Sequence, residues 1–417
     1  MKPSSRWSDR DRAVAGLRVA FDLSVLSLTV GVEEELMLID PSSGRLVAGI
    51  EHVLRRVGGD ERFDAELRAS QVELVTRPYL SAADVGRELA LARLDLAAAI
   101  DEEIAPMACG AHPTATDPGP ITDRERYRAI ARENPWAARF MLTCGLHVHV
   151  AVADGDRALA VYNALRSFLP ELAALSANSP FHASSDTGVG SARLQLNRSL
   201  PRHGVPPVFR DWDAYADLAD WGRAGDAIPD PSYHWWDLRL HPGFGTVELR
   251  VCDTQTEISD TVALVALAQT LVAWLAQRHD AGERLPVHDG HRITESVALG
   301  LRLDGPGSLL CLDTGERQRT NDRVARLLEE LGPTAADLGT HAELARLLPL
   351  DTARGAERQE AVARERGSEG LVDWLARRTL EAPRAFLEEA GVPLEARGLL
   401  GRDDGIDPVG RSVPAGV

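Results

Sequence analysis

The chain has 417 residues, of which 44% are hydrophobic and 26% charged, and its formal net charge is -17. This globular composition excludes wholesale disorder, and the acidic balance argues against a protein that tracks nucleic acid, which needs a basic surface to displace counterions from phosphates. Lys2 is the only lysine, so a P-loop, a protein kinase and a pyridoxal enzyme, each of which places a lysine in its site, are disfavoured.

One catalytic domain is expected over residues 28–390, preceded by a loosely ordered extension over 1–27 and followed by a flexible tail over 391–417. The most apolar stretch, 261–276, contains Thr and Gln and is short for a bilayer, so it predicts a buried helix and no membrane contact. The cysteines stand far apart without a C-x-x-C pair, which is typical of reduced cysteines in a cytoplasmic protein. They are Cys109, Cys144, Cys252 and Cys311.

Alternating apolar residues between turn residues predict strands, and apolar residues at helical spacing predict helices. In chain order, strands are expected at 28–39, 71–76, 145–152, 192–197, 236–240 and 246–251. Helices are expected at 83–104, 155–176, 260–278, 321–331 and 370–390. Because the helices come in blocks, the pattern favours an α+β fold with an antiparallel sheet. The segment 201–231, rich in Pro, Asp, Trp and Gly, predicts a long ordered loop.

The first chemical motif is the acidic run Gly31-Val32-Glu33-Glu34-Glu35. On a strand, Glu33 and Glu35 share one face and Glu34 points to the other. Two carboxylates on one face repel each other unless a cation lies between them, and Mg²⁺ prefers such oxygen ligands. A solvated strand edge is the alternative for an isolated E-x-E. Because Glu34 faces away, we expect it to tolerate replacement by Gln.

Two further motifs add candidate ligands. Glu73 alternates with apolar neighbours on a strand, where a buried carboxylate needs a partner, whereas Glu66 before it could equally lie on a helix surface. His147 and His149 in Gly-Leu-His-Val-His-Val share one strand face and could bind metal or phosphate. A hydrogen-bonded structural histidine is the commoner fate of either residue alone.

The motifs that come later in the chain contain arginines as well as carboxylates. Glu248 and Arg250 would line one strand face, where the guanidinium suits phosphate oxygens and the carboxylate holds the cation. A cross-strand ion pair on a sheet surface is the alternative. The polar segment around Ser176-Ala177-Asn178-Ser179-Pro180, followed by Arg193, predicts a pocket for a small charged substrate.

In their order, these motifs resemble the type 2 glutamate–cysteine ligase family, also called the carboxylate–amine ligases. The resemblance spans about residues 30–380 and depends on ordered co-occurrence. The matching motifs are G-x-E-x-E at 31–35, E-x6-E with V-E-x-x-T at 66–76, G-x-H-x-H-V at 145–150, S-A-N-S-P at 176–180, P-R-x-G-x-P-P at 201–207, and W-D-x-R-x-H with G-T-x-E-x-R at 236–250. A weaker match is Gly-Ala-Glu-Arg-Gln at 355–359.

The resemblance implies a fold similar to glutamine synthetase and the guanido kinases, in which helices pack on the outer face of a bowl-shaped antiparallel sheet. It also implies that ATP phosphorylates a carboxylate and an amine attacks the acyl phosphate, giving a γ-glutamyl-type amide, ADP and phosphate. The implied cofactors are ATP as co-substrate and Mg²⁺, which Mn²⁺ could replace. The partners would be a small carboxylate and a small amine, and the apolar helices allow a homodimer.

Residue roles follow from the resemblance by position. The implied metal ligands are Glu33, Glu35, Glu66, Glu73, His147 and Glu248. The implied catalytic residues are Glu33 and Arg250, and the implied ATP- or substrate-binding residues are Asn178, Arg193, Arg239 and Arg250. Such a site stabilises phosphoryl transfer through metal and arginine, without lysine.

One segment departs from the family pattern. Residues 292–301 lack the Asn and Arg that the family often carries there, so contacts on the nucleotide or product side are expected to differ. Two alternatives stay open at this point. A zinc-dependent amidohydrolase-type enzyme could use H-x-H with more histidines, and a member of the fold could bind nucleotide without turnover. The further histidines available are His182, His203, His234 and His241.

Overall fold

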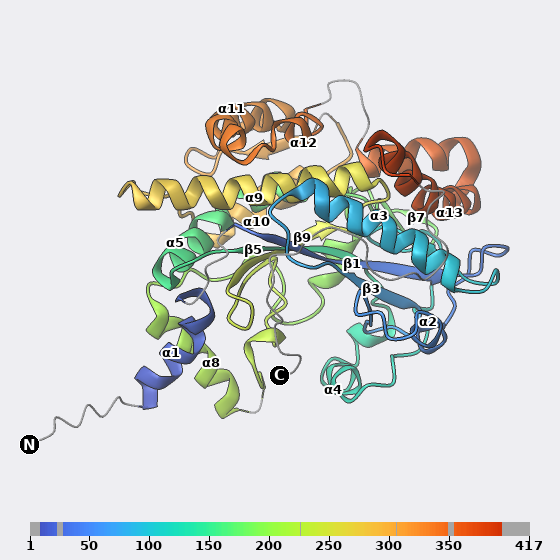
Figure 1. Ribbon diagram of the computed structural model, residues 1–417, viewed down its shortest axis with the longest axis horizontal. Helices are drawn as coiled ribbons and strands as arrows, with labels where there is room; N and C mark the ends of the chain where they lie inside the picture. Colours follow the sequence, from blue (N-terminus) through green and yellow to red (C-terminus); the bar gives the residue numbers. More distant parts are fainter. Residues whose placement is uncertain (1–8, 23–27, 226, 306, 349–353, 394–417) are drawn as a thin grey trace, which may run out of the picture.

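The computed structural model describes residues 9–22, 28–225, 227–305, 307–348 and 354–393 (Figure 1). Its centre is an antiparallel sheet in the order β2-β3-β1-β5-β9-β8, with β4 pairing with β1. The strands are β1 (Val30–Ile39), β2 (Phe63–Ala65), β3 (Gln71–Val75), β4 (Ala105–Met107), β5 (Gly145–Ala151), β8 (Leu238–His241) and β9 (Thr246–Asp253). The predicted α+β class with an antiparallel sheet is therefore confirmed.

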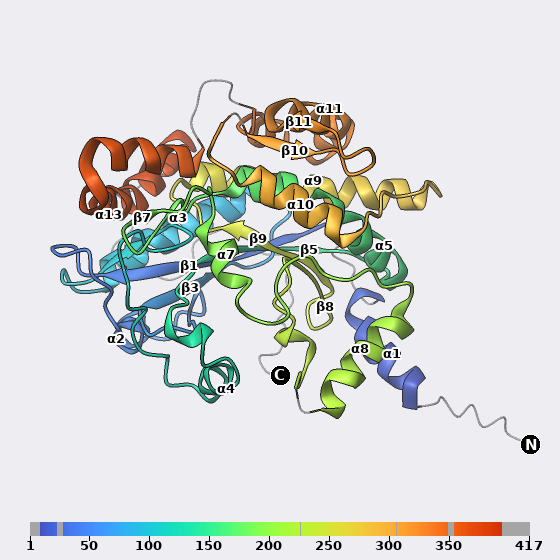
Figure 2. The same cartoon turned by 180° about the vertical axis from the view of Figure 1, so that it is seen from behind.

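Helices cover one face of the sheet most completely. Figures 1 and 2 show α3, α9, α10 and α13 on this side, with α11 and α12 further out, whereas α4 and α8 lie on the opposite side. The helices are α1 (Asp9–Asp22), α2 (Ile50–Arg56), α3 (Ala82–Ala99), α4 (Glu125–Glu133), α5 (Gly155–Leu165), α6 (Leu169–Ser176), α7 (Ala192–Asn197), α8 (Trp212–Ala224), α9 (Ile258–Asp280), α10 (Gly290–Gly300), α11 (Thr320–Leu338), α12 (His341–Ala345) and α13 (Gly355–Glu389).

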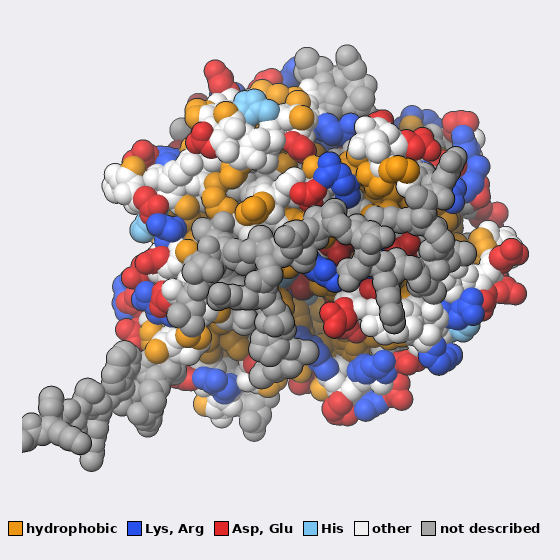
Figure 3. Space-filling model, viewed as in Figure 1, with side chains coloured by type: hydrophobic (Ala, Val, Ile, Leu, Met, Phe, Trp, Pro, Cys, Tyr) orange, Lys and Arg blue, Asp and Glu red, His pale blue; other side chains and the backbone are white. Residues whose placement is uncertain are grey.

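Short elements complete the chain. Two small hairpins pair β6 (Phe181–His182) with β7 (Ser185–Asp186) and β10 (Ser308–Leu310) with β11 (Arg317–Arg319). Short 3-10 helices lie at Ala137–Arg139, Arg166–Phe168 and Pro231–Tyr233. On the face drawn in Figure 3, acidic and basic side chains are intermixed, as expected for a chain that does not collect its arginines for nucleic acid.

The main core lies between the sheet and α3 with α9. Along β1, Val32, Leu36 and Leu38 belong to this core, because alternate side chains of a strand point to the same face. Helix α9 is long and apolar enough to cross a membrane by length and composition, but 83% of its most apolar window is buried inside the protein. The prediction of a buried core helix at 261–276 is thus confirmed.

Three expectations need correction. The segment 192–197 was expected to be a strand but is helix α7, because Ser191 caps its N-terminus by accepting a hydrogen bond from the Leu194 amide. The expected loop at 201–231 contains helix α8, whose N-terminus is capped by Asp211.

The third correction concerns the expected N-terminal extension. Its residues Asp9–Asp22 form helix α1, and the ring of Phe21 is buried 5.5 Å from that of Trp212. Arg18 forms an ion pair with Asp156. This part of the segment is therefore packed against the domain. Most of the expected C-terminal tail, 394–417, lies outside the described residues.

Candidate functional site

A cavity of about 340 Å³ lies on the face of the sheet opposite α3 and α9. Its walls come from β1, β3, β5, β8 and β9, with α4, α7 and the loop after residue 199 at its sides. It contains Glu33, Glu35, Glu66, Glu73, His147, Arg193, Arg239 and Arg250. The structure thus brings together, in one cavity, most of the site residues that the sequence predicted.

Strand register explains this convergence. The pairing of β1 places Glu35 opposite Glu73 on β3 and Glu33 opposite His147 on β5. His149 on β5 in turn lies opposite Glu248 on β9. Directly opposed residues in an antiparallel pair point their side chains to the same face, so the four strands present one row of ligands.

The row contains three groups of possible metal ligands. Within each group, one ligand atom per residue lies within 4.8 Å of the others. The groups are Glu33, His149 and Glu248; Glu33, Glu73 and His147; and Glu35, Glu66 and Glu73. All six residues predicted as metal ligands belong to these groups, and His149 is added to them. Carboxylates with a few imidazoles suit Mg²⁺ or Mn²⁺ better than a thiolate-preferring metal.

Glu33 is held as an anion by the two histidines. Burial by itself would raise the pKa of Glu33, but His149 and His147 outweigh it and hold this pKa well below its usual value. Nδ1 of His147 lies 3.1 Å from Oε2 of Glu33, and Nε2 of His149 lies 3.3 Å from Oε1.

The other carboxylates show the opposite behaviour. Burial and the charge of Glu66 raise the pKa of Glu35 to about 8. Burial and the charges of neighbouring carboxylates, above all Glu33, raise the pKa of Glu73 well above its usual value, and burial raises that of Glu66. Buried carboxylates at such close range hold protons unless a cation neutralises them. This donor set therefore fits a divalent cation.

Glu248 organises the arginines of the site. Its side chain is fully buried, Nε of Arg239 donates to Oε2 at 2.7 Å, and Arg250 donates to Oε1. Burial opposes ionisation of Glu248, but Arg239 and Arg250 hold its pKa below the usual value. Glu248 thus fixes two guanidinium groups at the cavity wall as well as joining a ligand group. Such fixed forks match phosphate oxygens.

Arg193 and Asn178 differ in position. Arg193 lines the cavity, donates through Nη2 to the carbonyl of Arg250 at 2.9 Å, and keeps a buried Nε without a described partner. Asn178 lies outside the cavity lining and is buried, and its Nδ2 donates to the Thr254 carbonyl at 2.8 Å. Its Oδ1 accepts from Gln359 at 2.8 Å. Asn178 is therefore a structural link between the end of β9 and α13, and the prediction that it binds substrate finds no support in this position.

The H-x-H alternation makes His149 a candidate ligand together with His147, but the resemblance implies only His147, and the structure places His149 in a ligand group with Glu33 and Glu248. Other residues of the cavity wall carry no signal in the sequence. Arg126 on α4 enters the cavity wall from a segment without any motif. Asp237, Tyr127, Trp235 and Phe244 complete the wall.

The zinc hydrolase alternative requires further histidine ligands, and in the described part of the chain none of the four candidate histidines belongs to a ligand group. His203 and His241 line the cavity, but neither belongs to a ligand group in the part of the chain that the structure describes. The ring of His234 stacks on that of Trp236, with the ring centroids 4.3 Å apart. His182 lies in the small β6–β7 hairpin. The segment 292–301, expected to alter nucleotide or product contacts, covers most of α10 and its C-cap residue Leu301, and it contributes nothing to the cavity lining.

Comparison with known families gives a match over residues 29–371, to the family described as glutamate-cysteine ligase family 2 (GCS2). A protein of Rubrobacter xylanophilus, provisionally named glutamate–cysteine ligase 2-3, is 37% identical over 358 residues, covering 84% of this chain and 97% of the relative. A protein of Frankia alni, provisionally named glutamate–cysteine ligase 2-1, is 35% identical, with coverages of 84% and 93%.

Solved structures agree on the fold. The glutamate–cysteine ligase of Francisella tularensis, solved in complex with AMP, has a TM-score of 0.61 at 14% identity, covering 87% of this chain and 91% of its own. A bifunctional glutathione synthetase of Pasteurella multocida gives 0.60 at 13% identity, with coverages of 91% and 54%. The family match over most of the sequence carries the assignment: the chain belongs to glutamate-cysteine ligase family 2 and is an ATP-dependent ligase that forms an amide bond.

Proposed function

We propose that the protein condenses a glutamate-like carboxylate with the amine of a second amino acid, through an acyl phosphate, and releases ADP and phosphate. The observation that carries the proposal is the row of ligand groups beside Arg239 and Arg250 in one cavity. ATP, a carboxylate and an attacking amine must meet in such a reaction, and only the cation and arginine charges are needed to neutralise the transferring phosphoryl group. The cavity offers ligand groups for a cation and places two arginines beside them.

The carboxylates would hold Mg²⁺, with Mn²⁺ as a substitute. A bound divalent cation neutralises phosphate charge and fixes the orientation of the polyphosphate. Glu33 serves two of the ligand groups, and Glu73 links the second of them to the third. Arg250 and Arg239, held by Glu248, would orient the phosphoryl group, and Arg193 would bind the carboxylate substrate.

A mixed-substrate assay tests this proposal. The protein is incubated with ATP, Mg²⁺ and pooled amino acids, and the products are separated by mass. We expect ADP together with a new species whose mass is the sum of two amino acids less one water. ADP formation that does not depend on amino acids, or amide hydrolysis that needs zinc and no ATP, would contradict the proposal.

A cytoplasmic location and a homodimer are also proposed for this protein, and the mixed-substrate assay does not test either of them.

Binding of Mg²⁺ is expected to release protons. The pKa of Glu35 is about 8, so this carboxyl group is mostly protonated at neutral pH in the metal-free protein, and the pKa values of Glu66 and Glu73 are raised in the same direction. A cation requires the ionised forms, so the apparent affinity should rise with pH until about 8 and then level off. Calorimetric titration of Mg²⁺ in two buffers with different ionisation enthalpies measures the release.

A matched variant isolates the source of these protons. Glu35→Gln should release fewer protons than the native protein, because one titrating ligand is removed. Identical heats in the two buffers for the native protein would show that the carboxylates are already ionised before the cation binds, and would contradict the protonation states described above.

A further inference from the structure

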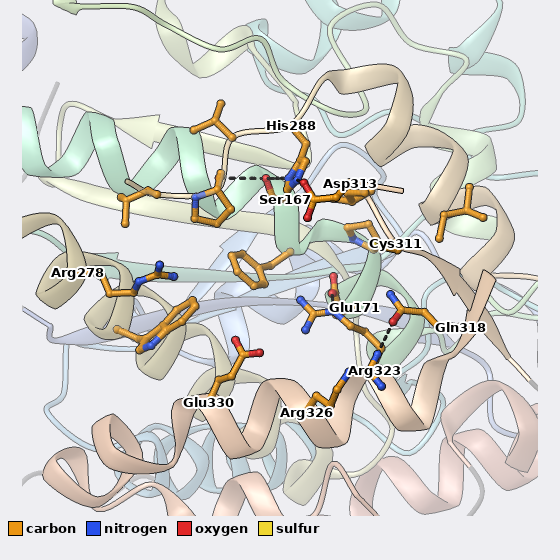
Figure 4. Close-up of a pocket in the computed structure, with 18 of the residues that line it drawn as sticks. Ser167, Glu171, Arg278, His288, Cys311, Asp313, Gln318, Arg323, Arg326 and Glu330 are labelled. Atoms are coloured by element: carbon orange, nitrogen blue, oxygen red, sulfur yellow. Dashed lines mark hydrogen bonds and ion pairs between the residues drawn. The ribbon is translucent and has the colours of Figure 1, made fainter. Parts of the chain in front are cut away.

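A second cavity, of about 730 Å³, lies on the helical side of the protein (Figure 4). Its walls come from α6, α9, α11, the β10–β11 hairpin and the loop after α9, and it shares no lining residue with the ligase cavity. Figures 1 and 2 show α9, α10 and α11 on the side of the sheet away from α4 and α8. It is a separate compartment, of a size typical of small-molecule sites.

Hydrogen bonds between distant segments fix one wall of this cavity. Oγ of Ser167 lies 3.0 Å from Nδ1 of His288, and Nε2 of His288 lies 3.1 Å from Oδ1 of Asp313 (Figure 4). Arg292 on α10 donates to the carbonyl of Leu312 at 2.7 Å. The loop after α9 and the hairpin turn are therefore tied to the helices, and the cavity is formed before any ligand arrives.

Glu171 on α6 leaves an acceptor unused in this cavity. Its side chain is only 5% exposed, and one carboxylate oxygen, Oε1, lies 2.7 Å from Nε of Arg323. The other oxygen, Oε2, is buried and has no hydrogen-bond partner among the described residues. A buried polar atom without a partner is costly, so a ligand that donates a hydrogen bond or carries a positive charge would be favoured there.

Two guanidinium groups at the same cavity lack acidic partners. Arg326 lies on α11 one turn from Arg323 and donates to the neutral Oε1 of Gln318. In the described chain, Arg284 on the loop after α9 makes no hydrogen bond or ion pair. Arg278 differs, because it pairs with Glu283 and lies over the ring of Trp274. Arg326 and Arg284 are thus available to a carboxylate.

We propose that this cavity binds a small zwitterion, an amino acid or a short peptide. Its ammonium group would meet Oε2 of Glu171, and its carboxylate would meet Arg326 and Arg284. The aromatic surfaces of Phe168 and Trp274 in the same lining would contact its side chain. A simple anion would use the arginines but would leave the acceptor of Glu171 unmet, which is why the zwitterion is favoured.

Cys311 provides a direct reporter of occupancy. It lines this cavity and is partly exposed, whereas Cys109, Cys144 and Cys252 are at most 1% exposed. A neutral aromatic disulfide should therefore label Cys311 selectively, and Cys311→Ser should abolish the fast labelling. In the full-length protein without ATP, a zwitterion at about ten times its Kd is expected to slow this labelling about tenfold. Calorimetry with the same amino acids and dipeptides measures binding independently.

Variants separate this site from the ligase cavity. Arg326→Gln changes an exposed residue that should not affect folding, and it should weaken both protection and calorimetric binding about tenfold, as the loss of one charge-assisted hydrogen bond predicts. Glu171→Gln should also weaken binding, whereas Arg317→Gln, an exposed residue outside the lining, should leave it unchanged. Protection by inorganic phosphate or ATP alone, equal binding by Arg326→Gln, or no binding of any amino acid or dipeptide would overturn the proposal.

Discussion

Replacing Glu33 with Gln is expected to lower the rate of ADP formation by about 100- to 1,000-fold, the scale typical of removing one group that stabilises charge in a transition state. Glu33 takes part in two of the three ligand groups and is kept ionised by His147 and His149. Gln has the same size and can still accept a hydrogen bond, but it lacks the charge that a cation requires. The rate is measured with saturating ATP, Mg²⁺ and both co-substrates.

The loss should be catalytic and not a consequence of unfolding. Removal of the Glu33 charge relieves repulsion on Glu73 but also removes the attraction to His147 and His149, so some loss of stability is expected, and far-ultraviolet circular dichroism at the assay temperature should still show the native fold. Glu61→Gln, at an exposed position outside the cavity, is the matched control and should retain native turnover. Native turnover in Glu33→Gln as well would contradict the assignment of this row as the metal site.

Replacing Glu34 with Gln is expected to cost about 3–5 kcal/mol in the free energy of unfolding, the range found when one partner of a buried ion pair is removed. Strand alternation alone predicts tolerance here, because Glu34 faces away from the site. The structure confirms the direction of the side chain but not the tolerance. Both Glu34 and Arg93 are fully buried, and Arg93 donates to both carboxylate oxygens, at 2.7 and 2.8 Å. Urea unfolding followed by far-ultraviolet circular dichroism measures the cost.

A double variant and an exposed pair provide the controls. Glu34→Leu with Arg93→Met replaces both charges and should recover part of the loss, although the carbonyls of Gln255 and Thr256 lose their donor. Glu51→Gln breaks an exposed ion pair with Arg124 and should cost less than about 1 kcal/mol. A cost below about 1 kcal/mol for Glu34→Gln would contradict the prediction, because it would show that the buried charge of Arg93 does not depend on Glu34 for its stabilisation.

The part of the site on the sheet could be predicted because strand geometry is local. Alternation along β1 places Glu33 and Glu35 together whatever surrounds them, and β5 and β9 follow the same rule. The prediction of a strand at 192–197 was wrong, although it used the same alternation rule. The Ser191 side chain caps the N-terminus of this segment and favours a helix there.

Long-range partners could not be predicted from local pattern. Arg93 lies on α3, far along the chain from Glu34, and nothing in either segment identifies the other. Asn178 sits in a recognisable motif, but its hydrogen bonds to Thr254 and Gln359 depend on how β9 and α13 come together. Arg126 enters the cavity from α4, where only the packing of the helix decides which side chain faces inward.

In the proposed reaction, this cavity activates a carboxylate by phosphorylating it. Once the condensing pair is known, the carboxylate substrate is prepared with heavy oxygen and the phosphate released during amide formation is examined by mass spectrometry. An acyl phosphate transfers one carboxylate oxygen to that phosphate, so we predict one heavy oxygen per phosphate, formed together with ADP, and no such transfer in Glu33→Gln. Amide formation with unlabelled phosphate would contradict the account.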